Sequence, residues 1–454
     1  MTTPFDENQP YIDRPRSSCA LSGAMTTITA IPRGIPVLHS SPGCAGNTAW
    51  TQLGGGALQV GGYCGALNVP GTNIQEREVV FGGDTRLREE IAHTVEVIDG
   101  DLYVVISGCI PAMIGDDIVA AVADQVDAGK PVVVANTAGF KGNAYLGYDL
   151  VLEAIIEQFV KRGLPQKKGK VNLLGIVPSW DVFWRGNIAA VRELLEAVGL
   201  EVNSFFSADD CVADISRASE AEYTIVVSGA YGIRAATALK KHHGVPWLSF
   251  PLPIGPTQSG EFLRQVAVAL HLDSKTVEKV ITDRERRYYS ILESLTDCYS
   301  DMDLQRYAVV IGDANYSASI PRFLAEDLGW LPELTVCTEK QLDGEGQQRI
   351  QAAIDAIDAS IRPELVFDSD TSRVPEHLNR RWPQNTEGTY RNAMSPAFVV
   401  GSSFDREFAL SIGAAHLSVS FPVANRAVLD RGYAGYSGGL RLIEDLLSSI
   451  ILGR

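Results

Sequence analysis

The chain has 454 residues, and its 39 Lys and Arg against 55 Asp and Glu give a formal net charge of −16. A chain this acidic binds phosphate backbones and anionic lipid poorly, which excludes nucleic acid and membrane surfaces as expected partners. It does not open with a charged leader followed by an apolar core, and it contains no run of ~20 apolar residues. We therefore expect a soluble, cytoplasmic protein. At about 150 residues per domain, the length predicts two or three domains.

The first 18 residues are polar and contain Pro4, Pro10 and Pro15. This composition predicts an extended arm, and such arms lie across a partner or stay mobile.

The cysteines are seven in number, an odd count, and they are scattered along a chain without a secretion signal. This usage indicates reduced thiols with a metal-binding subset, not a disulfide framework.

Cys109 has the clearest surroundings of the seven. Residues 101–107, DLYVVIS, form a β-branched apolar run that ends at Gly108, and residues 110–129 carry apolar residues at helical spacing. The cysteine is therefore expected at the carboxyl end of a strand, at the sheet edge where ligands collect. Backbone NH groups at the start of the following helix favour a thiolate there.

Two further cysteines are expected in similar turns between a strand and a helix. Cys44, in SSPGCAG, follows the apolar run IPVLH, and Cys19 follows Ser18. The alternative is that they are ordinary buried thiols, because free cysteine is among the most buried residue types.

The spacing of these three cysteines argues against structural zinc, because no CxxC pair occurs and no histidine lies at zinc-finger distance. Soft ligands on separate loops leave an iron–sulfur cluster as the predicted metal group. Three thiolates do not complete a usual four-ligand cluster, so the missing ligands are expected from another chain.

A glycine-rich passage, residues 52–71, lies between Cys44 and Cys109. It lacks the GxxxxGK[ST] pattern of a phosphate cradle, so we expect it to allow close approach to a cluster or a partner. Cys64 lies in this loop as a weaker fourth candidate ligand, and we interpret it as a bystander.

The rest of the chain alternates apolar strand-like runs with helices of 10 to 20 residues, the pattern of doubly wound parallel α/β domains. The polar stretch QKKGK predicts a joint near residue 168, and a long helical region covers residues 259–299. We expect an N-terminal arm with a cluster-binding α/β domain (1–168), a second α/β domain (169–304) and a third (305–454). The turn GDANYS does not match the GxGxxG dinucleotide motif and is interpreted as structural.

The motifs CALSGA, SPGCAG, QEREVVFGGD, SGCIPAMIGDDI and NTAGFKGNAYLGYD, in this order, resemble the nitrogenase component 1 superfamily. The resemblance continues through VPWLSFPLPIGPTQSGEFL, YAVVIGDANYSASIPRFLAEDLGW and AFVVGSSFDREFALSIGAAHLSVSFPV. It implies three repeated Rossmann-like domains and a cluster at the interface of two homologous chains. It also implies that Cys19, Cys44 and Cys109 are ligands of an iron–sulfur cluster, either of the 8Fe:7S P-cluster type or 4Fe:4S.

The superfamily pairs an α-type chain, whose cysteine and histidine anchor an active-site cofactor, with a β-type chain that contributes only to the interface cluster. Where the resemblance places the cysteine, this sequence has Ser228, and near its end it has Tyr433 and Tyr436 in place of a histidine. His416 lies earlier and is interpreted as a strand-end residue. The resemblance therefore implies a β-type subunit without a catalytic or cofactor-binding residue of its own.

The family's mechanism implies an α2β2 heterotetramer that receives electrons from an ATP-dependent iron protein and relays them to the α-type cofactor. Asn143 stands where the nitrogenase β chain has a serine near the cluster, and GCAG and CIPAMIGDD are similar to the assembly-scaffold members. Among the nitrogenase-like reductases we favour the methylthio-alkane reductases, K-type subunit, which cleave carbon–sulfur bonds. The alternatives are the β subunit of a dinitrogen-reducing nitrogenase, a scaffold for cofactor assembly, and a metal-free α/β protein that binds a small molecule.

Overall fold

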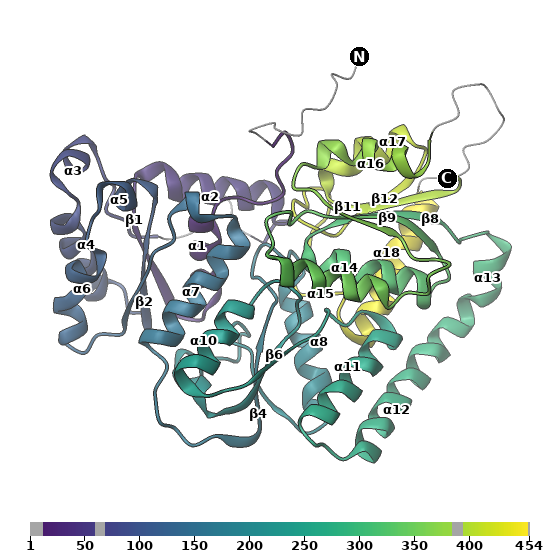
Figure 1. Cartoon of the computed structure of the whole chain (residues 1–454), viewed down its shortest axis with the longest axis horizontal. Helices are drawn as coiled ribbons and strands as arrows, with labels where there is room; N and C mark the ends of the chain where they lie inside the picture. Colours follow the sequence, from purple (N-terminus) through teal and green to yellow (C-terminus); the bar gives the residue numbers. More distant parts are fainter. Residues whose placement is uncertain (1–11, 60–68, 384–393, 453–454) are drawn as a thin grey trace.

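The computed structural model describes residues 12–59, 69–383 and 394–452, and their strands form three sheets in chain order (Figure 1). The strand orders are β1-β2-β3, β5-β4-β6-β7 and β10-β9-β8-β11-β12, and the pairings within these sheets are parallel. The strands are β1 (Gly34–His39), β2 (Leu102–Ser107), β3 (Val132–Ala135), β4 (Lys167–Leu174), β5 (Glu201–Asn203), β6 (Ala221–Val226), β7 (Trp247–Ser249), β8 (Tyr307–Gly312), β9 (Leu331–Cys337), β10 (Glu364–Phe367), β11 (Ala397–Gly401) and β12 (Ala415–Ser418). The expected α/β class is confirmed.

Helices alternate with these strands and flank the sheets. The α-helices are α1 (Ala20–Ala30), α2 (Pro42–Gly55), α3 (Glu76–Phe81), α4 (Asp84–Val97), α5 (Cys109–Ile114), α6 (Ile118–Asp127), α7 (Ala144–Gln158), α8 (Trp184–Ala197), α9 (Val212–Ser216), α10 (Ile233–His243), α11 (Gly255–Ala269), α12 (Ser274–Leu292), α13 (Thr296–Asp301), α14 (Ala314–Glu326), α15 (Gly344–Asp355), α16 (Val374–Arg381), α17 (Arg406–Ser411) and α18 (Gly435–Leu452). Short 3-10 turns are η1 (Gly139–Lys141), η2 (Ala218–Glu220), η3 (Glu293–Leu295), η4 (Thr371–Arg373) and η5 (Ser403–Asp405).

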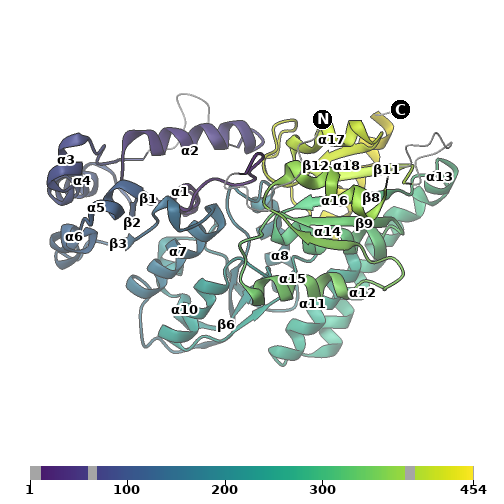
Figure 2. The ribbon, with the colours of Figure 1, turned by 45° about the horizontal axis from the view of Figure 1, so that its top comes forward.

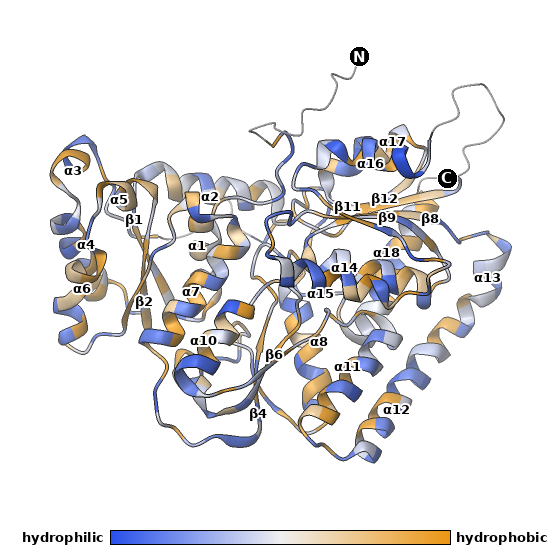
Figure 3. Cartoon of the chain, in the orientation of Figure 1, coloured by the Kyte–Doolittle hydropathy of each residue, from blue (hydrophilic) through white to orange (hydrophobic). Residues whose placement is uncertain are grey.

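The first sheet is covered on both faces, which explains its unbroken apolar strand. All six residues of β2 are buried, as expected for the central strand of a parallel sheet. Helices α1 and α7 pack against each other on one face, and α4 and α6 pack together on the other. In Figure 3 strands β1 and β2 are mostly hydrophobic, whereas α12, with one buried face, alternates between the two colours.

The single helix expected over residues 110–129 is two helices in the structure. Helix α5 ends at Gly115, which has a left-handed φ of +82°, a conformation that glycine adopts without strain. Helix α6 then begins anew, because the Asp117 carboxylate accepts a hydrogen bond from Ala120 N at 3.0 Å.

Helix α2 extends into the glycine-rich passage, which was expected to be a loop from residue 52. Its last residue, Gly55, lies so close to the third sheet's segment that a Cβ there would be 2.5 Å from the Phe421 ring. The close approach at Gly55 is therefore to another part of the same chain. Figure 2 shows α2 reaching from the first sheet toward the elements around α17. Cys64 lies outside the described residues.

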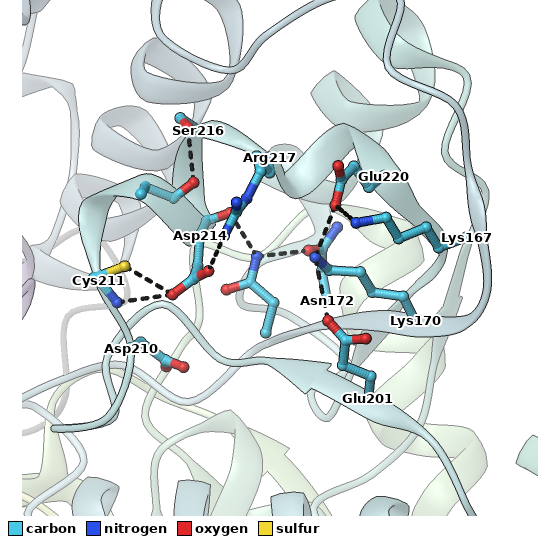
Figure 4. A network of polar contacts seen from close by, with 12 residues as sticks. Lys167, Lys170, Asn172, Glu201, Asp210, Cys211, Asp214, Ser216, Arg217 and Glu220 are labelled. Carbon is cyan, nitrogen blue, oxygen red and sulfur yellow. Dashed lines mark hydrogen bonds and ion pairs between the residues drawn. The ribbon is translucent and has the colours of Figure 1, made fainter.

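Strand β4 of the second sheet begins inside the polar stretch QKKGK, at Lys167, next to the expected boundary after residue 168. Its lysines are neutralised along the strand. Glu220 accepts from Lys167 Nζ at 2.7 Å and from Lys170 Nζ at 3.0 Å (Figure 4). Lys170, only 5% exposed, also lies 3.3 Å from Glu201. Paired in this way, basic residues can begin a strand.

The three sheet segments are not packed independently of one another. The C-terminal helix α18 follows the third sheet, yet it packs against α11 and α8, which follow strands of the second sheet. Over the described part of the chain, no helix combines the length and apolar character needed to cross a bilayer.

Candidate metal centre at three cysteines

Cys109 lies where the sequence predicts, directly after β2 and at the first residue of α5. Gly108 precedes it in an extended conformation as the residue that caps the helix. The thiol is partly exposed at the carboxyl edge of the first sheet. A metal ligand at this position would be held by a strand that is itself fully buried.

Cys44 follows β1, but it lies within the first turn of α2 and not in the turn before it. Its sulfur accepts a hydrogen bond from Ser40 Oγ at 3.2 Å, and Ser41 Oγ lies 3.7 Å away. Ser40 packs tightly against the strand end that carries Cys109, because a Cβ on Gly108 would lie 2.1 Å from Ser40 Oγ. The loops of these two cysteines are therefore in direct contact.

Cys19 differs from the expectation, since no strand precedes it. It caps the start of α1, and its backbone forms an isolated antiparallel bridge with Asn143. The next residue, Ala20, donates its NH to Gly142 O at 2.9 Å. Helix α1 is buried from Ala20 to Ile28, whereas Cys19, at its N-cap position, is exposed.

The thiols of Cys19 and Cys109 both lie next to the Cα of Gly139. A Cβ built on Gly139 would lie 3.1 Å from the sulfur of each. Any side chain at residue 139 would therefore crowd both sulfurs. Sequence reasoning did not single out Gly139 or Ser40, since a glycine in NTAGF and a serine in SSPG are common loop residues.

The structure brings the three cysteine loops together without forming a pocket for one metal ion. Within residues 12–59, 69–383 and 394–452, no group of three or more His, Cys, Asp or Glu side chains is placed to hold a single ion. The donor set of three thiols at helix starts, two of them converging on a glycine, suits a cluster of several irons.

A buried histidine, His39, joins the segments that follow β1 and α5. His39 ends β1, and its Nε2 lies 3.0 Å from Asp116 Oδ2, while its Nδ1 lies 3.1 Å from Thr72 Oγ1. The other oxygen of Asp116 accepts from Gly83 N at 2.9 Å. Burial lowers the pKa of His39 against the opposing effect of Asp116, which favours a neutral ring. Neither residue of this pair was predicted to be functional, although a histidine at a strand end and the GDD motif were visible signals.

Asn143 connects the cysteine region to the third sheet. Its side-chain Oδ1 accepts from Leu146 N at 3.2 Å and caps α7, and its side-chain Nδ2 donates to Glu339 Oε2 at 2.6 Å. Burial raises the pKa of Glu339, which is 4% exposed, to about 8.

Ser228 and Tyr433, which the sequence resemblance places where an α-type chain would anchor a cofactor, make hydrogen bonds within the chain. Ser228 is fully buried, and its hydroxyl accepts from Ala230 N at 3.1 Å and Tyr231 N at 2.9 Å. The Tyr433 hydroxyl donates to Asp445 at 2.6 Å and accepts from Arg426 at 2.8 Å.

The neighbouring residues at these positions are also buried in the protein. Tyr436 is buried on α18. His416 lies in β12 as expected, with Nε2 2.9 Å from Ser402 O, and burial lowers its pKa.

The other described cysteines lie in different elements. Cys211 donates its thiol to Asp214 at 2.9 Å beside α9 (Figure 4), and Cys298 lies on α13 with its sulfur 3.1 Å from that of Met302. Cys337 is fully buried at the end of β9, and burial raises the pKa of its thiol to about 12.

Comparison with known proteins identifies the family of the chain. A family model described as nitrogenase component 1 type oxidoreductase matches residues 19–451. The chain is 22% identical over 479 residues to the nitrogenase molybdenum-iron protein beta chain of Methanococcus maripaludis, covering 96% of this chain and 94% of that one. It is 24% identical over 476 residues to the beta chain of Methanothermobacter marburgensis, covering 98% and 96%.

Two other relatives extend the comparison. The nitrogenase iron-molybdenum cofactor biosynthesis protein NifE of Klebsiella pneumoniae is 28% identical over 267 residues, 56% of each chain. The solved structure described as "Nitrogenase Cp1 at pH 6.5" superposes with a TM-score of 0.78 at 17% identity, covering 99% of this chain and 95% of that one, which shows a shared fold. Because the family model matches nearly the whole chain, the protein belongs to the nitrogenase component 1 type oxidoreductase family.

Proposed function

We propose that the chain is the β-type subunit of a nitrogenase-like reductase. In this proposal Cys19, Cys44 and Cys109 hold one half of an iron–sulfur cluster, of the 8Fe:7S P-cluster type or alternatively 4Fe:4S. The observation that carries it is the convergence of the Cys19 and Cys109 sulfurs on Gly139. Three thiolates leave such a cluster short of ligands, so a homologous α-type subunit supplies the others.

The bound cluster would supply one-electron transfer, and the chain's own residues would tune and fix it. The Ser40 hydroxyl, 3.2 Å from the Cys44 sulfur, would stabilise the more negative, reduced state. The pair of His39 and Asp116 holds the two strand-end loops in place. Gly139 leaves the space in front of Cys19 and Cys109 open.

In the complete enzyme an ATP-dependent iron protein would donate electrons, and the cluster would relay them to a cofactor in the α-type subunit of a cytoplasmic α2β2 complex. The internal hydrogen bonds of Ser228 and Tyr433 support a chain without catalytic or cofactor-binding residues. We propose reductive carbon–sulfur cleavage of small methylthio-alkanes as the reaction. The reduction of dinitrogen is the alternative that the beta-chain relatives suggest.

A second candidate function is a scaffold on which a metal cofactor is assembled. The similarity to NifE over about half of the chain favours it. A scaffold would gain and lose its metal during assembly and would reduce no substrate.

The test is the iron content of the complex purified without oxygen together with its natural α-type partner. Alanine at Cys19, Cys44 or Cys109 should lower bound iron, whereas Cys337→Ala should leave iron unchanged, because that thiol is buried in β9. Equal iron loss at Cys337 and Cys109 would contradict the ligand assignment.

Turnover assays of the wild-type complex with the iron protein then separate the functions. Release of a thiol from a methylthio substrate supports the proposed reaction, and ammonia from dinitrogen supports the alternative. A complex that exchanges metal without turnover identifies a scaffold.

A further inference from the structure

The residues just before Cys19 bind to loops of the third sheet, and not to the first sheet, on which α1 packs. Asp370, in the loop after β10, accepts hydrogen bonds from Asp13 N and Arg14 N, each at 3.2 Å. The described part of the expected mobile arm is therefore attached to a loop more than three hundred residues away in the sequence.

Arg16 is the most buried residue of this segment. It is 5% exposed, its Nε donates to Thr371 Oγ1 at 2.9 Å, and its Nη2 forms an ion pair with Asp405. Its guanidinium also lies 5.5 Å from the centre of the Phe404 ring. Thr371 follows β10 and Asp405 follows β11, so one arginine joins two loops of the third sheet.

The other side of Cys19 has a second tether. Asn143, its bridge partner, donates to Glu339 in the loop after β9. The loops after β9, β10 and β11, which belong to one sheet, thus hold the residues around Cys19. The carboxyl edge of a parallel sheet is its usual ligand-binding edge, and here it holds this segment of the chain.

We infer that Arg16 is a positioning residue for Cys19, and that the third sheet determines where the Cys19 thiol lies relative to Cys109. Cys44 and Cys109 follow strands β1 and β2 of the first sheet, which pair with each other. Cys19 follows no strand: the start of α1 and the bridge to Asn143 hold it on one side, and the distant loops hold the residues before it. The relevance to a metal cluster rests on the proposed function, whereas the geometry itself can be tested without metal.

The experiment uses the metal-free full-length chain and dibromobimane, a short reagent that joins two nearby thiols. Peptide mapping by mass spectrometry measures the Cys19–Cys109 cross-link in wild type, Arg16→Met and Arg16→Lys. We expect the cross-link to fall at least about threefold in Arg16→Met, because releasing one end lowers the effective concentration of the two thiols. Arg16→Lys, which keeps the charge opposite Asp405, should recover part of it.

Arg14→Met is the matched control, because that side chain is 43% exposed and lies 3.9 Å from its nearest carboxylate, that of Glu407. It should cross-link as wild type does. Alkylation of Cys109 and of buried Cys337, measured in the same samples, distinguishes loss of positioning from unfolding. A positioning role changes the cross-link alone, whereas a general loss of stability also exposes Cys337.

If Arg16→Met unfolds, Thr371→Val is the deciding variant. It removes the two hydrogen bonds of the Thr371 hydroxyl, from Arg16 Nε and to Arg14 O, and keeps the ion pair of Arg16 with Asp405. Unchanged cross-linking in a folded Arg16→Met chain, or in Thr371→Val where the first variant unfolds, overturns the inference. The iron content of the partnered complex is a separate readout. Loss of iron in Cys19→Ala but not in Arg16→Met would leave the proposed function standing and count against the positioning role.

Discussion

Gly139 controls the space between the thiols of Cys19 and Cys109. A methyl group there would lie 3.1 Å from each sulfur, closer than ordinary van der Waals contact. Overpacking of this kind costs about 1–3 kcal/mol, and here the groups displaced would be the metal ligands. Gly139→Ala should therefore reduce the iron bound by the partnered complex by at least about half.

Gly46→Ala is the control for that substitution. It lies two residues from Cys44 on α2, and a Cβ there would have no atom within 4 Å. Iron content by absorption and metal analysis should match wild type. If Gly139→Ala also kept its full iron content, the two sulfurs would not share a cluster at this point.

The position of Cys109 was predictable, but the surroundings of the three cysteines were not. Cys109 follows a continuous buried strand, and that pattern is visible in six consecutive residues. Gly139 and Asn143 act through contacts with residues far away in the sequence, which no local pattern encodes. Ser40 bonds to nearby Cys44, but it also packs against Gly108, which is distant in the sequence.

At the scale of elements, the start of β4 depends on a buried ion pair. Glu220→Gln would leave Lys170, 5% exposed, with only the carboxylate of Glu201, which is 69% exposed. Removing one partner of a buried pair costs about 3 kcal/mol or more, so the free energy of unfolding measured in urea should fall by this amount.

Glu201→Gln tests the same lysine from the solvent side. Exposed pairs contribute less than about 1 kcal/mol, so this variant should unfold close to wild type. Equal losses for the two variants would show that burial of the Glu220 pair does not stabilise the strand.

The element predictions failed where a single residue overrides a pattern. Gly115 ends α5 within an apolar periodic run, so the one helix expected over residues 110–129 is two. The strands themselves were predictable, because buried parallel strands are continuous apolar runs.

For the whole molecule, buried carboxyls make stability depend on pH. Asp327, at the end of α14, accepts from Thr257 of α11 at 2.6 Å, and burial raises its pKa from 3.8 to about 7. The folded state then binds this proton more tightly than the unfolded state. The free energy of unfolding is therefore highest below about pH 4 for this group and falls as pH rises toward about 7, by at most about 4 kcal/mol.

Asp327→Asn should remove that part of the slope, because the amide does not titrate. Urea unfolding at about pH 5 and about pH 8 measures it in both proteins. Asp283→Asn, with an exposed side chain, should keep the wild-type slope. A slope unchanged in Asp327→Asn would contradict the raised pKa.

The three sheets in chain order were predictable from the alternation of strands and helices, and the superposition with a solved nitrogenase confirms this architecture. The contacts between their segments were not. The return of α18 to α8 and α11, and the attachment of Arg16 to the loops after β10 and β11, join residues that only the folded chain brings together.

The central claim is that a cluster is shared between this chain and a partner. The most direct measurement is native mass spectrometry under anaerobic conditions, with iron counted for the chain expressed alone and with its α-type partner. We expect an iron-poor chain when it is expressed alone and an iron-loaded complex of both subunits, since three cysteines cannot complete the cluster. A stable monomer carrying the full iron content would contradict it.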